Sequence, residues 1–156
     1  FHRNWKRSKS NDIIRGAYHF FIASKDGKMQ AENFIKKVDL QTGDLPPVLD
    51  VEQLNGVSSA QLRKEVKKWL ETAENYYNVT PIIYTNVDFY KRNLGSDFDR
   101  YPLWVAHYYE PEQPRIEREW VFWQHSDQGN IDGIIRKVDF NVFKGDSLQF
   151  RNILVP

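Results

Sequence analysis

Apolar positions along this chain follow two alternating periods, one typical of short β-strands and one typical of α-helices. Strand-like runs rich in β-branched and aromatic residues occupy residues 13–22, 48–52, 81–86, 102–108, 120–126 and 138–143. Helical spacing predicts helices over residues 1–8, 29–38, 58–77 and 87–94. No helical pattern follows residue 108, so we expect a loop holding Gly129, Asp132 and Gly133 to join the last two strands.

The helix predicted over residues 58–77 has the strongest pattern. Ser58 followed by Gln61 forms a capping-box signature at its start. One face of the helix then carries apolar residues at helical spacing, namely Leu62, Val66, Trp69, Leu70, Ala73 and Tyr77. Gly95 is expected to end the shorter helix 87–94, because glycine readily takes the left-handed conformation that ends helices.

The alternation of strands and helices implies parallel strands with right-handed crossovers, in either an α/β barrel or an open sheet. Chemically active side chains follow several strands: Tyr18, His19, Asp50, Glu52, Tyr84, His107, Gln124 and Asp139. Strand ends converge on one pocket in a barrel, so we favour an irregular (β/α) barrel with few helices near its C-terminus. We expect residues 1–156 to form a single domain.

The amino-acid composition argues against several classes of function. The chain has 22 basic and 21 acidic residues, so it lacks the positive charge typical of nucleic-acid binding. The one basic run, residues 2–9, is interpreted as a solvated helix face. The absence of cysteine excludes disulfides and thiolate metal sites, and no apolar stretch reaches the roughly 20 residues of a membrane span. We expect no metal, cofactor, nucleic-acid partner or membrane partner.

The candidate chemistry lies in Asp50 and Glu52. Residues two apart on a strand share one face, which would place these side chains roughly 6–7 Å apart. One carboxyl of such a pair should keep its proton to higher pH and act as a general acid, while the other stabilises positive charge. Pro46 and Pro47 exclude helix before the pair, so it follows a strand. The alternative is two solvated acids at an exposed strand end.

Six segments, taken in order, resemble glycoside hydrolase family 25. They are Arg15-Gly-Ala-Tyr-His-Phe-Phe21, Gly43-Asp-Leu-Pro-Pro-Val-Leu-Asp-Val-Glu52, Pro81-Ile-Ile-Tyr-Thr-Asn86, Tyr101-Pro-Leu-Trp-Val-Ala106, Phe122-Trp-Gln124 and Val138-Asp-Phe-Asn-Val-Phe143. This family comprises the Chalaropsis-type lysozymes, or N-acetylmuramidases, which have an irregular α/β barrel. The resemblance covers nearly the whole chain, and six ordered motifs are far more specific than one pair of acids.

The resemblance implies hydrolysis of the β-1,4 bond between N-acetylmuramic acid and N-acetylglucosamine in peptidoglycan glycan strands. Glu52 would be the general acid/base and Asp50 would steady a charged intermediate, with assistance from the substrate's acetamido group. Direct attack and an inverting route stay open. The implied substrate-binding residues are Asp139, Tyr84, Tyr18, Trp104, Gln124 and Phe20. A ring that packs within the barrel is the alternative interpretation of Trp104, and we expect His19 and His107 to be structural.

The resemblance also implies features that this sequence lacks. Family members open with a strand bearing an Asp-x-Ser-type motif, followed by a helix and a second apolar strand. Asp12 precedes the Tyr18 strand and cannot replace that aspartate. We therefore expect an N-terminally truncated barrel that is inactive and prone to associate, whereas the intact enzyme would be monomeric and secreted or directed to the cell envelope.

Two other functions compete with this interpretation. A chitinase-like hydrolase also uses two acids two residues apart, but its motif has further aspartates at alternate positions, where this chain has Val48 and Pro46. A non-catalytic glycan-binding remnant of the same barrel would keep the aromatic sugar contacts and lose turnover.

Overall fold

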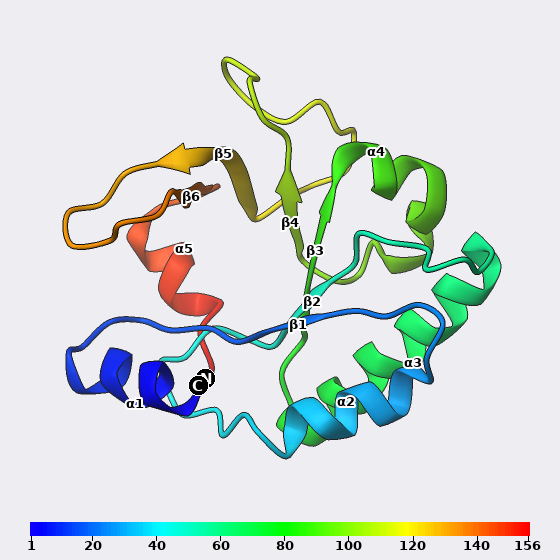
Figure 1. Cartoon of the computed structure of the whole chain (residues 1–156), viewed down its shortest axis with the longest axis horizontal. Coiled ribbons are helices and arrows are strands. Elements are labelled where there is room, and N and C mark those ends of the chain that lie inside the picture. Colours follow the sequence, from blue (N-terminus) through cyan, green and yellow to red (C-terminus); the bar gives the residue numbers. More distant parts are fainter.

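The computed structural model describes residues 1–156 and contains one six-stranded sheet with helices (Figure 1). The strands pair in sequence order, with the first five parallel and the sixth antiparallel to the fifth. They are β1 (Tyr18–Phe20), β2 (Val48–Asp50), β3 (Ile82–Asn86), β4 (Leu103–Ala106), β5 (Phe122–Gly129) and β6 (Val138–Phe143). This arrangement confirms the mixed α/β class and the six predicted strand positions.

Five α-helices accompany the sheet: α1 (His2–Ser10), α2 (Gly27–Ile35), α3 (Ser59–Tyr77), α4 (Val87–Phe89) and α5 (Ser147–Asn152). A π-helical turn and a 3₁₀ turn extend α4 over residues 90–94 and 95–98. The predicted start of α3 is confirmed, because the Ser58 hydroxyl accepts the Gln61 backbone N–H at 3.2 Å. The Gln61 side chain instead donates to Glu65. None of the helices combines the length and apolar character that crossing a membrane requires.

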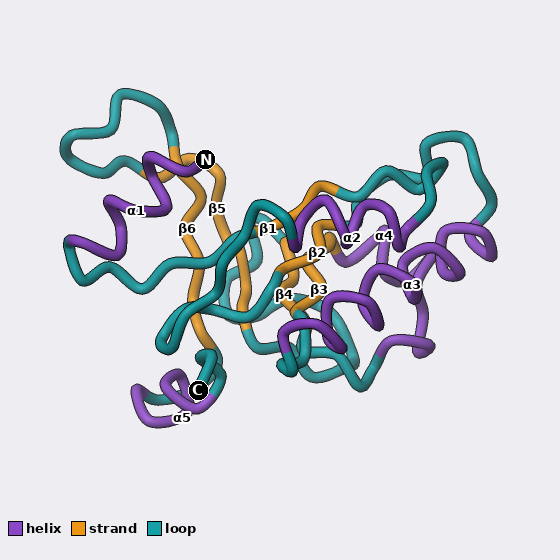
Figure 2. Tube along the Cα trace, turned by 90° about the horizontal axis from the view of Figure 1, so that it is seen from below, coloured by secondary structure: helices purple, strands orange, loops and turns teal.

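The two faces of the sheet have different coverings. Helices α2, α3 and α4 lie together on one side of β1–β4 (Figure 2), where the main core forms. Alternate strand residues, including Leu49 and Ile83, point into this core. Their neighbours Val48 and Ile82 point to the opposite face and pack with Phe122 in a smaller apolar cluster. The residues that follow them on that face, such as Asp50 and Tyr84, are therefore kept out of the main core.

Helix α5 corrects the expectation that no helix follows residue 108. Asp146 caps it through a complete capping box with Gln149. Its Phe150 packs against Phe122 and Phe143, with ring centroids 6.2 and 5.3 Å apart. The helix thus covers part of the small apolar cluster.

The sheet is curled but open, so the prediction of a barrel is met only in part. Strands β1 and β6 each pair with a single neighbour and do not pair with one another. The strand expected over residues 13–22 is also shorter than predicted, because only residues 18–20 pair with β2. Gly129, expected in a loop, ends β5.

A buried ion pair fixes the extended chain before β1. The Arg15 guanidinium donates to both carboxylate oxygens of Asp44 at 2.9 and 3.0 Å and stacks on the Trp5 ring at 3.8 Å. Asp44 also accepts the Gln41 N–H, and its backbone C=O accepts the Val155 N–H at 2.8 Å. These contacts tie helix α1 and the C-terminal segment to the chain around Asp44.

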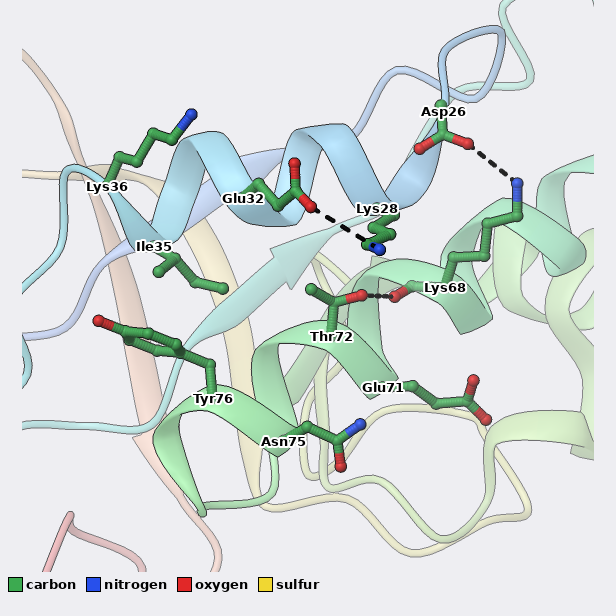
Figure 3. Close-up of a pocket in the computed structure, with 10 residues that line it drawn as sticks. All are labelled: Asp26, Lys28, Glu32, Ile35, Lys36, Lys68, Glu71, Thr72, Asn75 and Tyr76. Carbon is green, nitrogen blue, oxygen red and sulfur yellow. Dashed lines mark hydrogen bonds and ion pairs between the residues drawn. The ribbon is translucent and has the colours of Figure 1, made fainter.

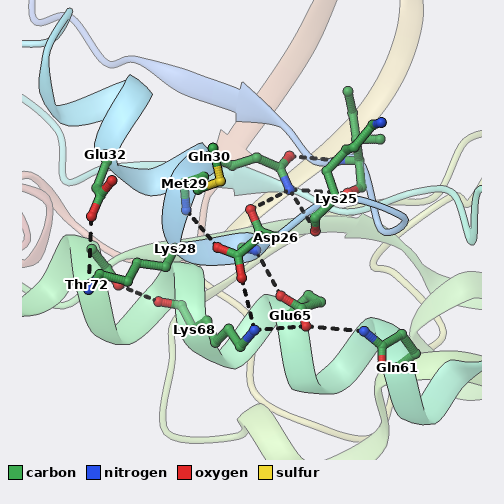
Figure 4. Close-up of polar contacts among 12 residues, drawn as sticks. Lys25, Asp26, Lys28, Met29, Gln30, Glu32, Gln61, Glu65, Lys68 and Thr72 are labelled. Atoms are coloured by element: carbon green, nitrogen blue, oxygen red, sulfur yellow. Dashed lines mark hydrogen bonds and ion pairs between the residues drawn. The ribbon is translucent and has the colours of Figure 1, made fainter.

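Helices α2 and α3 meet at a glycine. The Gly27 backbone N–H, at the start of α2, donates to the buried Glu65 carboxylate of α3 at 2.8 Å. Glu65 also accepts from Lys68, which bridges to Asp26, the N-cap of α2 (Figure 4). The charge of Glu65 therefore faces the positive end of the α2 dipole, where an anion is favoured.

Candidate active site

A pocket of about 380 Å³ opens near the carboxyl ends of the central strands, on the face opposite the main core. Nine residues line it: Tyr18, Val48, Asp50, Glu52, Tyr84, Trp104, Gln124, Asp139 and Asn141. Seven of the eight residues predicted from the sequence are among them. The eighth, Phe20, pairs in register with Asp50 but is not part of the lining, and its side chain is exposed.

Strand register explains why distant residues converge here. Asp50 pairs with Tyr84, and Tyr84 pairs with Trp104, so these three side chains form a row across β2, β3 and β4. Gln124 on β5 pairs with Ala106, which lies two residues after Trp104 on β4. Because paired residues in a parallel sheet point to the same face, the row presents one acid and two aromatic rings to the pocket.

The two carboxyls differ in their surroundings. Strand β2 ends at Asp50, so Glu52 lies in the loop just beyond it. Asp50 is 8% exposed, and its buried Oδ1 atom has no hydrogen-bond partner. Burial, together with the nearby charge of Glu52, raises the pKa of Asp50 to about 7. One carboxyl of the pair thus holds its proton toward neutral pH, but in the free protein it is the more buried Asp50 and not Glu52, the residue expected to be the acid.

Two tyrosine hydroxyls fix the Gln124 side chain. Tyr84 and Tyr108 donate to its Oε1 atom at 2.6 and 2.7 Å. Gln124 is only 5% exposed, and burial raises the pKa of Tyr84, which keeps its hydroxyl a proton donor. With both lone pairs of Oε1 engaged, the amide is held in one orientation, and its Nε2 atom forms no hydrogen bond within the protein.

Sequence reasoning missed two residues at this site. Asn141 lines the pocket and accepts the Trp104 indole N–H at 2.8 Å. It lies two residues after Asp139 on β6, so the two-residue strand period could have identified it. Tyr108 lies beyond the end of β4, where no local pattern signals its bond to Gln124.

Trp104 both packs and lines the pocket. Its ring lies 4.7 Å from the Phe122 centroid and meets Tyr84 edge-on at 6.2 Å. The two interpretations offered by the sequence are thus compatible, because one edge is fixed while the residue still contributes to the pocket wall.

The two histidines have the structural roles expected of them. His19 shares a 3.0 Å hydrogen bond with Gln30 and stacks on Trp69 of the main core. His107 accepts the Arg115 N–H at 3.1 Å and lies 3.2 Å from Glu110. No group of three or more histidine or carboxylate side chains in the chain converges on a site that would hold a metal ion.

A larger pocket, of about 840 Å³, lies between α2 and α3 (Figure 3). All of its charged side chains except Lys36 pair among themselves or with neighbours, as in Lys28 with Glu32 at 4.0 Å and Lys68 with Asp26 at 3.0 Å. It contains no buried acid without a partner. We therefore place the candidate chemistry in the smaller pocket around Asp50 and Glu52.

Comparisons with known proteins identify the family of the chain. The family model described as "Glycosyl hydrolases family 25" matches residues 1–134, and the chain belongs to this family. A solved family 25 glycosyl hydrolase from Bacillus anthracis superposes with a TM-score of 0.89 at 30% identity, covering 97% of this chain and 74% of that one.

Curated relatives extend the comparison. The chain is 48% identical to the uncharacterized protein YegX of Escherichia coli over 145 residues, which is 93% of this chain and 53% of YegX. It is 33% identical to an autolytic lysozyme of Clostridium acetobutylicum over 136 residues, 87% of this chain and 41% of that protein. The chain thus spans about half the length of the curated relatives it matches.

Proposed function

We propose that the protein is a lysozyme that hydrolyses the β-1,4 bond between N-acetylmuramic acid and N-acetylglucosamine in peptidoglycan. The observation that carries this proposal is the carboxyl pair, in which buried Asp50 adjoins Glu52 in a pocket walled by Trp104 and Tyr84. Aromatic rings offer flat apolar faces for sugars, and a paired carboxyl supplies a transferable proton. The autolytic lysozyme among the relatives supports the same substrate.

In this proposal, Glu52 is the general acid and then the general base. Two interacting carboxyls titrate as a pair, so the proton held by Asp50 in the free protein belongs to both groups. Positive charge that develops on the sugar beside Asp50 favours the ionised form of Asp50. The shared proton is then held by Glu52 and is available to the leaving oxygen. Glu52, which is outside the strand and less buried, delivers it.

The buried Asp50 would then stabilise the cation formed when the substrate's own acetamido oxygen attacks the anomeric carbon. Asp50 lines the pocket and would accept the acetamido N–H. Gln124, Asp139 and Tyr18 would contact sugar hydroxyls around it, with Trp104 against a ring face. We further propose that the six strands belong to an irregular α/β barrel and that the enzyme acts at or outside the cell envelope.

Glu52→Gln tests this function. The variant keeps the shape of the side chain but removes its proton, so we expect release of reducing N-acetylmuramic acid ends from purified peptidoglycan to fall by about 10²–10⁴-fold. The matched control is Glu112→Gln, an exposed acid outside the pocket, which should retain wild-type activity.

Substrate choice separates the alternatives. Wild-type protein that cleaves chitin and leaves peptidoglycan intact would indicate a chitinase-like enzyme. Binding of glycan with no cleavage of either polymer, by the wild type as by the variant, would identify a binding protein and contradict the proposal.

A further inference from the structure

The pocket around Asp50 is lined by acids and by no base. Three carboxyls contribute to its wall, those of Asp50, Glu52 and Asp139, whereas no lysine, arginine or histidine does. None of the three carboxyls takes part in an ion pair. The basic residue closest to Asp139 along the chain, Lys137, donates to Asn130 at 2.8 Å. The negative charge of the pocket is therefore not neutralised by the protein.

These carboxyls act on the pocket together. Burial raises the pKa of Tyr84, which lines the same pocket, and the charges of Glu52, Asp50 and Asp139 raise it further. Whichever of Asp50 and Glu52 holds the proton of the pair, the other is ionised, and Asp139 adds a second negative charge. An anion that enters the pocket therefore meets two or more like charges and no cation.

We infer that this pocket selects N-acetylmuramic acid whose lactyl carboxyl is in amide linkage, and that it rejects the same sugar with a free lactyl carboxylate. The inference rests on the proposed hydrolysis, which places an N-acetylmuramic acid ring beside Asp50. The lactyl ether and the acetamido group occupy adjacent carbons of that ring. When the acetamido group contacts Asp50, the lactyl group lies in the same acidic surroundings, where a neutral amide is tolerated and a carboxylate is repelled.

Gln124 supplies the pocket with a donor that is neutral. Tyr84 and Tyr108 both donate to its Oε1 atom, so its Nε2 atom is the part of the amide left to bind a ligand. This N–H can donate to an amide carbonyl as well as to a carboxylate, but it brings no positive charge. Proteins bind carboxylates most strongly through arginine or lysine, and this pocket has neither.

The preference for an amide sets an order for two classes of reaction. In peptidoglycan the lactyl carboxyl is amide-linked to the stem peptide, so the group beside the acids is neutral. An amidase adds water across that linkage, which frees the amino end of the peptide and leaves a carboxylate on the sugar. The product of such an amidase is then a poor substrate. Glycan cleavage by this protein must therefore precede removal of the stem peptide.

Two isosteric substrates test the inference. They are tetrasaccharides of alternating N-acetylglucosamine and N-acetylmuramic acid, with every lactyl group either a carboxylate or a carboxamide. At neutral pH we expect kcat/KM to be about 10- to 100-fold higher for the carboxamide, as for repulsion by two charges in a site open to water. Asp139→Asn removes one of these charges, so the ratio should fall to about 3- to 10-fold. The control Asp97→Asn, an exposed acid outside the pocket, should keep the wild-type ratio.

A ratio near one in the wild type, or a ratio that Asp139→Asn leaves unchanged, would overturn the inference. A second measurement does not depend on turnover. Calorimetry on Glu52→Gln protein should show tighter binding of the carboxamide than of the carboxylate. Equal affinities would overturn the inference even if peptidoglycan hydrolysis were confirmed. Tighter binding of the carboxamide with no hydrolysis by the wild type would overturn the proposed function alone.

Discussion

The Tyr84 hydroxyl on β3 donates a 2.6 Å hydrogen bond to Gln124 Oε1 on β5, across the intervening strand β4. Side chains on strands that are not neighbours meet here because the sheet curls toward this face. The bond is therefore a consequence of the curvature that forms the pocket. The Tyr108 hydroxyl donates to the same Gln124 oxygen from the loop after β4.

Tyr84→Phe tests the contribution of the hydrogen bond from Tyr84 to Gln124. It leaves one lone pair of a buried oxygen unfilled, so we expect the free energy of unfolding to fall by about 0.5–1.5 kcal/mol. We also expect lower kcat/KM on peptidoglycan fragments, because the Gln124 amide is less firmly oriented. Urea denaturation and steady-state kinetics measure the two effects. Tyr76→Phe, on the exposed surface of α3, is the control, and equal effects of both variants would contradict a special role for the Gln124 bond.

The row of site side chains across β2, β3 and β4 could be predicted because it depends only on the local sequence pattern of each strand. Asp50 and Tyr84 each end an apolar run, and the two-residue period puts them on one face whatever their neighbours. The Tyr108 bond was not predictable, because it depends on the course of the following loop, where Tyr109 adopts a φ of 62° and is 90% exposed. Helix α5 carried a local signal in Asp146 and Gln149, but its six residues are too few to show helical periodicity.

The overall shape of the sheet cannot be predicted from the local sequence pattern alone. Alternating strands and helices fit both a closed barrel and an open sheet, since the difference lies in whether β1 and β6 meet. Phe20 illustrates the same limit. Its register beside Asp50 follows from the sequence order of the strands, but its exposure follows from its place on an edge strand with no outer neighbour.

Asp50→Asn should make stability less dependent on pH. The Asp50 carboxyl has a pKa of about 7 in the folded protein, against its ordinary value of 3.8. Between these values the folded state binds more protons than the unfolded state, so the free energy of unfolding decreases as pH rises from about 4 to about 7. The ionisation penalty is absent below this window and complete above it, and reaches up to about 4 kcal/mol.

Asparagine cannot ionise, so the variant should match the wild type at pH 4 and be more stable at pH 8, while losing activity. Urea denaturation at both pH values measures the difference. Asp132→Asn, an exposed change of the same type, should show no pH-dependent gain. If the stability difference between Asp50→Asn and wild type is the same at both pH values, the raised pKa of Asp50 is wrong.

Asp44→Ala should be among the most destabilising single changes in the protein. It leaves the Arg15 guanidinium buried without its partner, a loss of about 3–5 kcal/mol for a buried pair. Lys67→Ala breaks an exposed pair with Glu71 at 3.8 Å and should cost at most about 1 kcal/mol. Adding Arg15→Met to Asp44→Ala should restore part of the stability. A double variant less stable than Asp44→Ala would show that Arg15 contributes mainly through its contact with Trp5.

Gly27→Ala should separate α2 from α3 and lower stability without touching the pocket. A Cβ atom at Gly27 would lie 1.9 Å from the Glu65 backbone carbonyl oxygen, which belongs to a regular helix and cannot rotate away. The helices must move apart, which also lengthens the 2.8 Å bond from the Gly27 N–H to Glu65. Because overpacking costs about 1–3 kcal/mol and this clash is with backbone, we expect a loss at or above the upper end of that range.

The neighbouring change Lys28→Ala, on the exposed side of α2, serves as the control and should stay within about 0.5 kcal/mol of wild type. Thermal and urea denaturation measure both variants. At temperatures where Gly27→Ala remains folded, kcat on peptidoglycan should equal that of wild type, because α2 contacts β1 through Gln30 and His19 on the face opposite the pocket. Wild-type stability of Gly27→Ala would mean that the two helices are not packed this closely in solution.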